Sequence, residues 1–201
     1  GKSTQARRLA AACRQAGIDT VLTREPGGAP GAEQIRRLLV EGEEARWDPV
    51  AETLLHFAAR RDHVQKTVRP ALAGGRWVVS DRFADSTVAY QGYGEGVALD
   101  RIRGLYEWAV GDLLPDLTLV LDVPVEVGLR RAAARAAGAE RADRYERMDL
   151  AFHERLRQGF LAIAAAAPER CVVIDAGAPL DAVTGRVLTA VSSRFGVRLG
   201  G

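Results

Sequence analysis

The chain has 201 residues, of which 47% are hydrophobic and 27% are charged, and its formal net charge at pH 7 is +2. These values are typical of one globular domain with a sizeable core, and the near-neutral charge argues against a protein that binds nucleic acid through its phosphates. No run of about 20 apolar residues is present, so the sequence predicts no membrane span. Two cysteines far apart, Cys13 and Cys171, show no metal-ligand spacing and predict reduced thiols in a cytoplasmic protein.

The first four residues, Gly1-Lys2-Ser3-Thr4, match the end of the phosphate-binding loop G-x-x-x-x-G-K-[ST]. The chain has 28 basic residues other than histidine, but only Lys2 and Lys66 are lysines. This scarcity strengthens the match, because a slim ammonium suits the loop better than a guanidinium does. The alternative is an ordinary helix start capped by Ser3 or Thr4. Since the pattern begins upstream of Gly1, we expect the natural protein to have a buried strand and the rest of the loop before it.

Apolar patterns predict short strands that alternate with helices along the chain. Gly17 is expected to end the first helix, and Pro70 to interrupt the third. The strands are expected over 19–23, 77–80, 117–123 and 171–175, and the helices over 3–16, 31–40, 48–73, 99–113, 125–137, 149–166 and 179–194. This alternation predicts an α/β fold, a doubly wound parallel sheet with helices on both faces.

Ligands of such sheets bind beyond the carboxyl ends of the strands. Two of these ends pair a carboxylate with an arginine, Arg24-Glu25 after the first strand and Asp81-Arg82 after the second. Both pairs suit phosphate and magnesium, so a functional role is favoured for them. Asp122 and Asp175 end the later strands, and there a helix cap or a solvated charge is favoured.

Five segments in chain order resemble bacterial thymidylate kinases: GKST at 1–4, TREPGG at 23–28, FAAR at 57–60, DRFADSTVAYQG at 81–92 and DRYE at 143–146. The resemblance covers essentially the whole chain, and the second and fourth motifs are specific to this family. It implies a P-loop nucleoside monophosphate kinase fold over residues 1–201, with a mobile lid at about 130–147. It also implies transfer of the γ-phosphoryl group of ATP to dTMP, giving dTDP and ADP for dTTP synthesis, by a cytoplasmic homodimer that uses Mg²⁺.

This reaction requires positioning and charge neutralisation rather than covalent catalysis. The resemblance implies that Lys2 reaches the β- and γ-phosphates of ATP, and that Ser3 and Asp81 hold the metal. The implied ATP site comprises Gly1, Lys2, Ser3, Thr4, Arg131, Arg135 and Arg141. The implied catalytic residues are Lys2, Glu25, Arg82, Arg131 and Arg135, and which lid arginine acts on the transferring phosphoryl group stays open.

For dTMP, the resemblance implies that Arg82 and Arg36 bind the phosphate and that Arg60 bonds a carbonyl of the base. Glu25 is expected near the acceptor phosphate and sugar, and the base and sugar contacts are assigned to Ser86, Thr87, Tyr90 and Gln91. Tyr90 is the expected discriminator against a 2′-hydroxyl. The ring that stacks on the base is either His56, four residues before Arg60, or Phe57, three before it; Phe57 is favoured, although it could instead be a core residue.

Three other functions are weighed against this one. The first is another P-loop kinase, acting on a different nucleoside monophosphate or small molecule, which turnover of dTMP, dUMP, CMP and AMP would separate. The second is a non-catalytic relative that kept the fold for partner binding; the retained Lys2, Ser3, Glu25, Asp81 and Arg82 argue against it. The third is a nucleic-acid binder that uses the arginine-rich segment 129–147, which the near-neutral net charge disfavours.

Overall fold

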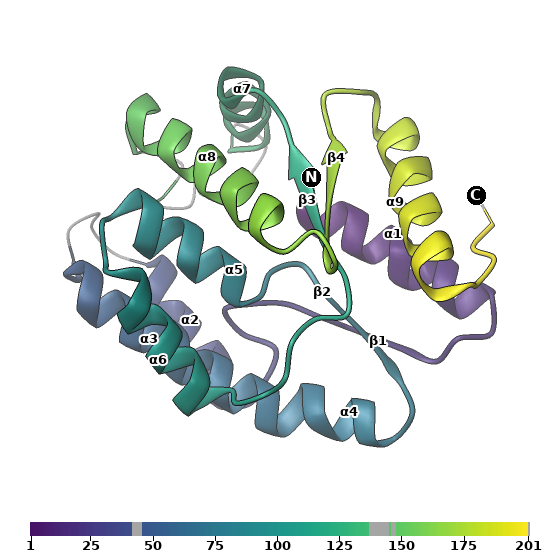
Figure 1. The fold of residues 1–201 in the computed structure, drawn as a ribbon, viewed down its shortest axis with the longest axis horizontal. Helices are drawn as coiled ribbons and strands as arrows, with labels where there is room; N and C mark the ends of the chain where they lie inside the picture. The colour runs from purple at the N-terminus through teal and green to yellow at the C-terminus, as the bar shows by residue number, and fades with distance from the viewer. Residues whose placement is uncertain (42–45, 137–144, 146–147, 201) are drawn as a thin grey trace.

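The computed structural model describes residues 1–41, 46–136, 145 and 148–200, with helices around four short strands (Figure 1). The strands are β1 (Thr20–Thr23), β2 (Trp77–Ser80), β3 (Thr118–Asp122) and β4 (Cys171–Asp175). The α-helices are α1 (Lys2–Gln15), α2 (Pro30–Val40), α3 (Pro49–His63), α4 (Arg69–Ala73), α5 (Ala84–Thr87), α6 (Leu99–Ala109), α7 (Val125–Ala136), α8 (Leu150–Ala166) and α9 (Leu180–Phe195). Two π-helical segments, η1 (Val64–Val68) and η2 (Val88–Gly94), follow α3 and α5.

The strands form two parallel pairs. β1 pairs with β2 from Thr20 opposite Trp77 to Thr23 opposite Ser80, and β3 pairs with β4 so that Asp122 lies opposite Asp175. β2 and β3 are not paired with each other in the described residues.

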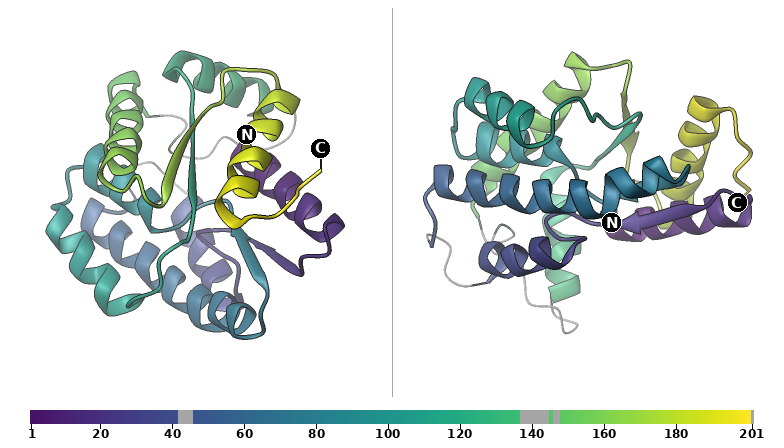
Figure 2. Two further views of the ribbon diagram at one scale, coloured as in Figure 1. Left: turned by 45° about the vertical axis from the view of Figure 1, so that its right-hand side comes forward. Right: turned by 90° about the horizontal axis from the view of Figure 1, so that it is seen from below.

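Helices cover both faces of β3, which explains why the strand is apolar at successive positions. Leu119 and Leu121 pack against a core cluster formed by α1 and α9, whereas Val120 packs with Ala164 of α8. Alternate side chains of a strand point to opposite faces, so a strand buried on both sides loses the usual alternation of polar and apolar residues. Figure 2 shows α1 and α9 close together in both views. The predicted α/β class with two helical layers is therefore confirmed.

The helix ends follow from local sequence. Gly17 has a φ of 80° just after α1, a left-handed conformation that favours glycine, as predicted. Asp48 caps α3, since its carboxylate accepts hydrogen bonds from the backbone N–H groups of Val50 and Ala51. The helix expected over 99–113 ends earlier, at Ala109, and Gly111 follows with a φ of 78°.

Pro70 interrupts the long helix, as predicted, because a new helix begins there. The chain continues from α3 through η1 into α4, with Pro70 in the first turn of α4. The N–H of Arg69 bonds back five residues to the carbonyl of Val64. A π-turn of this kind shifts the hydrogen-bond pattern just before the proline, so the missing N–H falls where a new helical turn begins.

The segment after β2 is helical, although the sequence predicted no helix there. Residues 84–94 form α5 and η2, and this stretch packs against α8 through Ala89, Tyr90 and Phe152. The segment contains two glycines and no long apolar periodicity, so tertiary packing rather than local preference makes it helical. Within the part of the chain that the structure describes, no helix is both long enough and apolar enough to cross a membrane.

Candidate active site

The predicted functional residues meet where β1 and β2 end. Asp81 directly follows β2, and its Oδ2 accepts a hydrogen bond of 2.8 Å from the hydroxyl of Ser3 at the start of α1. The other oxygen, Oδ1, lies 3.4 Å from the backbone nitrogen of Glu25 in the loop after β1. Three segments that are far apart in the sequence therefore come together at one carboxylate.

The start of α1 is suited to bind an anion. Lys2 and Ser3 are exposed on its first turn, and the helix continues for 14 residues. The free N–H groups and the dipole of a helix N-terminus favour phosphate. Ser3 and Asp81 add two hard oxygen donors, and no group of three or more potential metal-binding side chains lies within the described ranges. One or two protein oxygens, with phosphates and water completing the shell, are how proteins usually hold Mg²⁺.

Arg60 lies at the centre of a buried cluster. Its Nε donates to Oε2 of Glu25 at 2.9 Å, and its Nη2 donates to the hydroxyl of Thr87 at 3.1 Å. The guanidinium carbon lies 4.9 Å from the centre of the Phe57 ring and 5.6 Å from that of Phe83. Nη1 is buried and has no hydrogen-bond partner in the described part of the chain. Because an unsatisfied buried donor is costly, this nitrogen is well suited to a ligand oxygen.

Glu25 is more deeply enclosed than expected for a residue beside the acceptor phosphate. It is 4% exposed, and both of its carboxylate oxygens have protein partners. One bonds Arg60, and the other lies 2.9 Å from Nδ1 of His63, whose Nε2 lies 2.7 Å from the hydroxyl of Thr23. His63 was not predicted, although its place three residues after Arg60 puts it on the same helix face.

The two expected phosphate-binding arginines, Arg82 and Arg36, both bond to protein oxygens. Nη2 of Arg82 donates to the hydroxyl of Tyr90 at 3.1 Å, and Nη1 lies 3.5 Å from the hydroxyl of Ser86. The Arg82 guanidinium also lies over the Tyr90 ring, 5.0 Å from its centre. Arg36 donates from Nη1 to the carbonyl of Pro26 at 2.8 Å. The structure thus brings Arg82, Ser86 and Tyr90 together, and it places Arg36 against the 24–28 loop.

Two predicted base contacts are placed differently from expectation. Phe57 is only 3% exposed and belongs to a core cluster with Ile102 and Val110. Its surroundings are those of a core residue, which was the alternative to a stacking role. Gln91 is 1% exposed, and its amide nitrogen donates to Oε1 of Glu52 at 2.7 Å. The amide of Gln91 therefore bonds within the protein, because the helical segments α5 and η2 direct it towards Glu52 of α3.

His56 and Phe57 lie four and three residues before Arg60, so both rings are on its helix face, and Phe57 contacts its guanidinium. Burial, together with the positive charges of Arg60 and Arg82, lowers the pKa of His56 to about 3. Nε2 of this ring lies 3.3 Å from the hydroxyl of Tyr145, which also donates to Glu52. Neither Glu52 nor Tyr145 was singled out from the sequence, although Tyr145 belongs to the DRYE motif.

The arginines of the expected lid are only partly described. Nη1 and Nη2 of Arg131 donate to the carbonyls of Ala176 and Gly177 at 2.7 and 3.0 Å, so this side chain bonds to the loop after β4. The side chain of Arg135, and Arg141 entirely, lie outside the described residues.

The two carboxylates favoured as structural have structural partners. Asp122 forms a two-bond ion pair with Arg157, at 2.8 and 2.9 Å, which lowers the pKa of the carboxyl group. Asp175 accepts a hydrogen bond from the N–H of Gly177 and an ion pair from Arg186, and these contacts lower its pKa.

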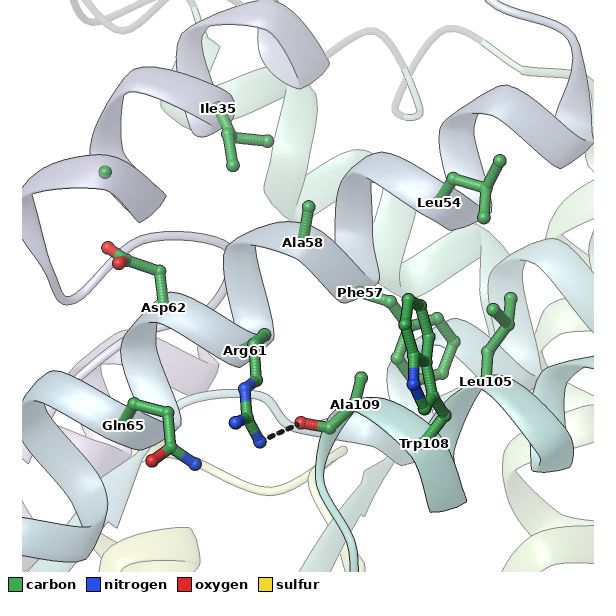
Figure 3. Close-up of a pocket in the computed structure, with 11 residues that line it drawn as sticks. Ile35, Leu54, Phe57, Ala58, Arg61, Asp62, Gln65, Leu105, Trp108 and Ala109 are labelled. Carbon is green, nitrogen blue, oxygen red and sulfur yellow. Dashed lines mark hydrogen bonds between the residues drawn. The ribbon is translucent and has the colours of Figure 1, made fainter.

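A separate apolar groove of about 760 Å³ lies on the other side of α3 (Figure 3). Leu54, Phe57 and Ala58 of α3 line it together with Leu105 and Trp108 of α6 and Ile35 of α2. Trp108 is 84% exposed, which is unusual for so large an apolar side chain. The groove holds none of the residues gathered around Asp81, so it is a second feature of the surface.

Comparisons with known proteins find relatives that match nearly the whole chain. The profile of the family described as thymidylate kinase matches residues 1–187. A thymidylate kinase of Caulobacter vibrioides is 56% identical over 197 residues, which cover 98% of this chain and 93% of the relative. One from Nitrobacter winogradskyi is 53% identical over 194 residues, 96% of this chain and 84% of the relative. The crystal structure of a thymidylate kinase from Ehrlichia chaffeensis superposes with a TM-score of 0.77 at 33% identity, covering 95% of this chain and 92% of the other.

Proposed function

The chain belongs to the thymidylate kinase family, ATP-dependent enzymes that transfer the γ-phosphoryl group of ATP to dTMP, and from this premise we propose which residues serve each substrate. The products are dTDP and ADP. Such a transfer has little covalent chemistry for the protein to perform, so its residues hold the two phosphates in line and offset their charge.

The donor side is formed by the first turn of α1. Lys2 contacts the β- and γ-phosphates, and the N–H groups of Ser3 and Thr4 add to the phosphate site with Gly1. Ser3 and Asp81 would hold Mg²⁺, which supplies positive charge to the β- and γ-phosphates when bound. The 2.8 Å contact between their side-chain oxygens supports this assignment, because both oxygens then face one small region.

The acceptor phosphate binds to Arg82, with Arg36 as a second contact. The hydroxyl of Tyr90 and the aromatic ring beneath it hold the guanidinium of Arg82 from two directions. A guanidinium held in this orientation can bind two oxygens of one phosphate at once, because its planar fork matches their spacing. Tyr90 also excludes a ribonucleotide, because its ring occupies space that a 2′-hydroxyl would need.

The base is read by Nη1 of Arg60. This buried donor lacks a protein partner among the described residues, and a carbonyl oxygen would satisfy it. We assign it to the base carbonyl that thymine has and 5-methylcytosine lacks, because a buried donor rejects an analogue that cannot accept its hydrogen bond. The neutral ring of His56 is the stacking candidate on this helix face, since Phe57 is enclosed in the core.

The single observation that carries these assignments is the hydrogen bond between Ser3 and Asp81. It joins the phosphate-binding helix to the residue that precedes Arg82. The ATP site and the site for the dTMP phosphate therefore lie next to each other. The test is initial-rate kinetics with ATP, Mg²⁺ and each of dTMP, dUMP, CMP and AMP. We expect kcat/KM to be highest for dTMP and Lys2→Ala to abolish turnover. Equal turnover of CMP or AMP would contradict the acceptor assignment.

The groove between α2, α3 and α6 is the surface through which we propose that two copies associate. Its exposed Trp108 and Leu54 would lose contact with water in a homodimer. Analytical ultracentrifugation of the wild type and Trp108→Arg tests this, with Leu72→Arg on α4 as a control outside the groove. We expect dimers for the wild type and the control and monomers for Trp108→Arg. If the Trp108→Arg variant is still a dimer, the groove is not the interface between the two copies.

A further inference from the structure

His63 is fully buried at the end of α3, and both of its ring nitrogens have polar partners. Nδ1 lies 2.9 Å from Oε1 of Glu25, and Nε2 lies 2.7 Å from the hydroxyl of Thr23. A carboxylate accepts, so Nδ1 carries a proton, and in the neutral ring Nε2 then accepts from the threonine hydroxyl. The orientation of the imidazole is therefore fixed from both sides.

Glu25 passes this constraint on to Arg60. Its second oxygen accepts from Nε of Arg60 at 2.9 Å, and both side chains of this ion pair are 3% exposed. Thr87 holds Nη2, so two of the three guanidinium nitrogens are fixed and only Nη1 lacks a partner in the described ranges. A planar guanidinium held at two nitrogens points the third in a defined direction.

The loop after β1 packs directly on His63. Gly28 has a φ of 82°, and a Cβ at this position would approach a ring atom of His63 to 2.6 Å. The hydroxyl of Thr67 also donates to the Gly28 carbonyl at 2.7 Å. The loop therefore lies against the imidazole and restricts its movement.

We propose that His63 is a positioning residue for base selection: it holds Glu25, and through Glu25 the Arg60 guanidinium, so that Nη1 faces the base carbonyl. The inference rests on the proposed role of Arg60 in base reading. His63 itself touches no substrate. Without it, Glu25 would lose one of its two restraints, and Arg60 could turn away from the direction that the base requires.

The test compares kcat/KM for dTMP with that for 5-methyl-dCMP, which carries an amino group in place of one base carbonyl. An amino group cannot accept a hydrogen bond from Nη1. The ratio of the two kcat/KM values therefore measures how well Nη1 of Arg60 is oriented towards the base carbonyl. We expect His63→Leu to lower the ratio about tenfold, while KM for ATP stays unchanged. Thr23→Val, which removes only the hydroxyl partner of Nε2, should lower the ratio in the same direction by about threefold.

Thr53→Val is the matched control. Thr53 is also buried on α3, but its hydroxyl donates to the carbonyl of Pro49 and takes no part in the cluster. This variant should lose stability without any change in the ratio. An unchanged ratio in a folded His63→Leu protein would overturn the proposal, and if that variant does not fold, an unchanged ratio in Thr23→Val overturns it equally.

Arg60→Gln distinguishes base recognition by Arg60 from the positioning role of His63. If it leaves the ratio unchanged, Arg60 does not read the base, and the proposed function of that residue fails first. If the ratio falls with Arg60→Gln but not with the His63 and Thr23 variants, base reading stands and the role of His63 is overturned.

Discussion

Asp81 accepts hydrogen bonds on both of its carboxylate oxygens, and the one from Ser3 joins two residues 78 positions apart in the sequence. We expect Asp81→Asn to lower kcat by about 100-fold with little change in KM for dTMP, because the amide cannot offer the same charge to a metal ion. A magnesium titration of the initial rate should show weaker apparent binding. Asp175→Asn, at the end of another strand, is the control that should keep both values.

Removing the hydroxyl that holds Arg82 should weaken acceptor binding. Tyr90→Phe deletes the 3.1 Å hydrogen bond to Nη2 but keeps the ring beneath the guanidinium. We expect KM for dTMP to rise about fivefold, the effect of losing one hydrogen bond worth about 1 kcal/mol. Tyr93→Phe, an exposed tyrosine close by in the sequence, should leave KM unchanged. Equal effects of the two changes would argue against the assignment.

His56 should make the stability of the folded protein sensitive to acid. The folded-state pKa of His56 is about 3, below its ordinary value of 6.5, so below about pH 6.5 the unfolded chain binds a proton that the folded protein does not. This group therefore contributes stability above pH 6.5 that is lost as the pH falls, by up to about 1.4 kcal/mol per pH unit. Urea unfolding at pH 7.5 and pH 5 should show a smaller loss for His56→Phe than for the wild type; equal losses would contradict the prediction.

The conformation of Gly28 should be costly to change. Its φ is 82°, and an added Cβ would lie 2.4 Å from the Thr23 hydroxyl, so Gly28→Ala should reduce the free energy of unfolding by more than about 2 kcal/mol. Gly104→Ala is the matched control, because this helical glycine has no atom within 4 Å of the added Cβ. The control should be neutral or stabilising by up to about 1 kcal/mol. Thermal unfolding of both variants measures the difference.

Asp122 should matter for stability and not for turnover. Its ion pair with Arg157 joins β3 to α8, and both side chains are partly exposed. We expect Asp122→Asn to lower the free energy of unfolding by about 1 kcal/mol while kcat and both KM values stay the same. A large fall in kcat would instead give this carboxylate a part in the reaction.

The sequence predicts the strands well because each is a short run rich in β-branched and other apolar residues. Each of the four begins and ends within one residue of the expected range, including β4, where Val172 and Val173 are exposed. The helices over 84–94 were missed because their stability comes from packing on α8, which local patterns do not record.

For the site, the sequence predicts which strand ends hold the functional residues but not which side chains contact one another. The proximity of Glu25 and Asp81 follows from the topology of a parallel sheet. That Glu25 would be enclosed by Arg60 and His63 depends on how α3 packs against the loop after β1, and no spacing in the chain encodes that distance. Phe57 and His56 differ by one position, so a rotation of the helix by one residue decides which ring faces the core.

Trp108 gives the protein a built-in optical signal. Of the three tryptophans, Trp77 packs against Phe195 and Trp47 donates to the carbonyl of Leu38, whereas the indole of Trp108 is almost entirely in water. Its fluorescence emission should therefore lie at long wavelength in a monomer and move to shorter wavelength when a second copy covers it. Dilution followed by emission spectra would read the association of two chains without any added label.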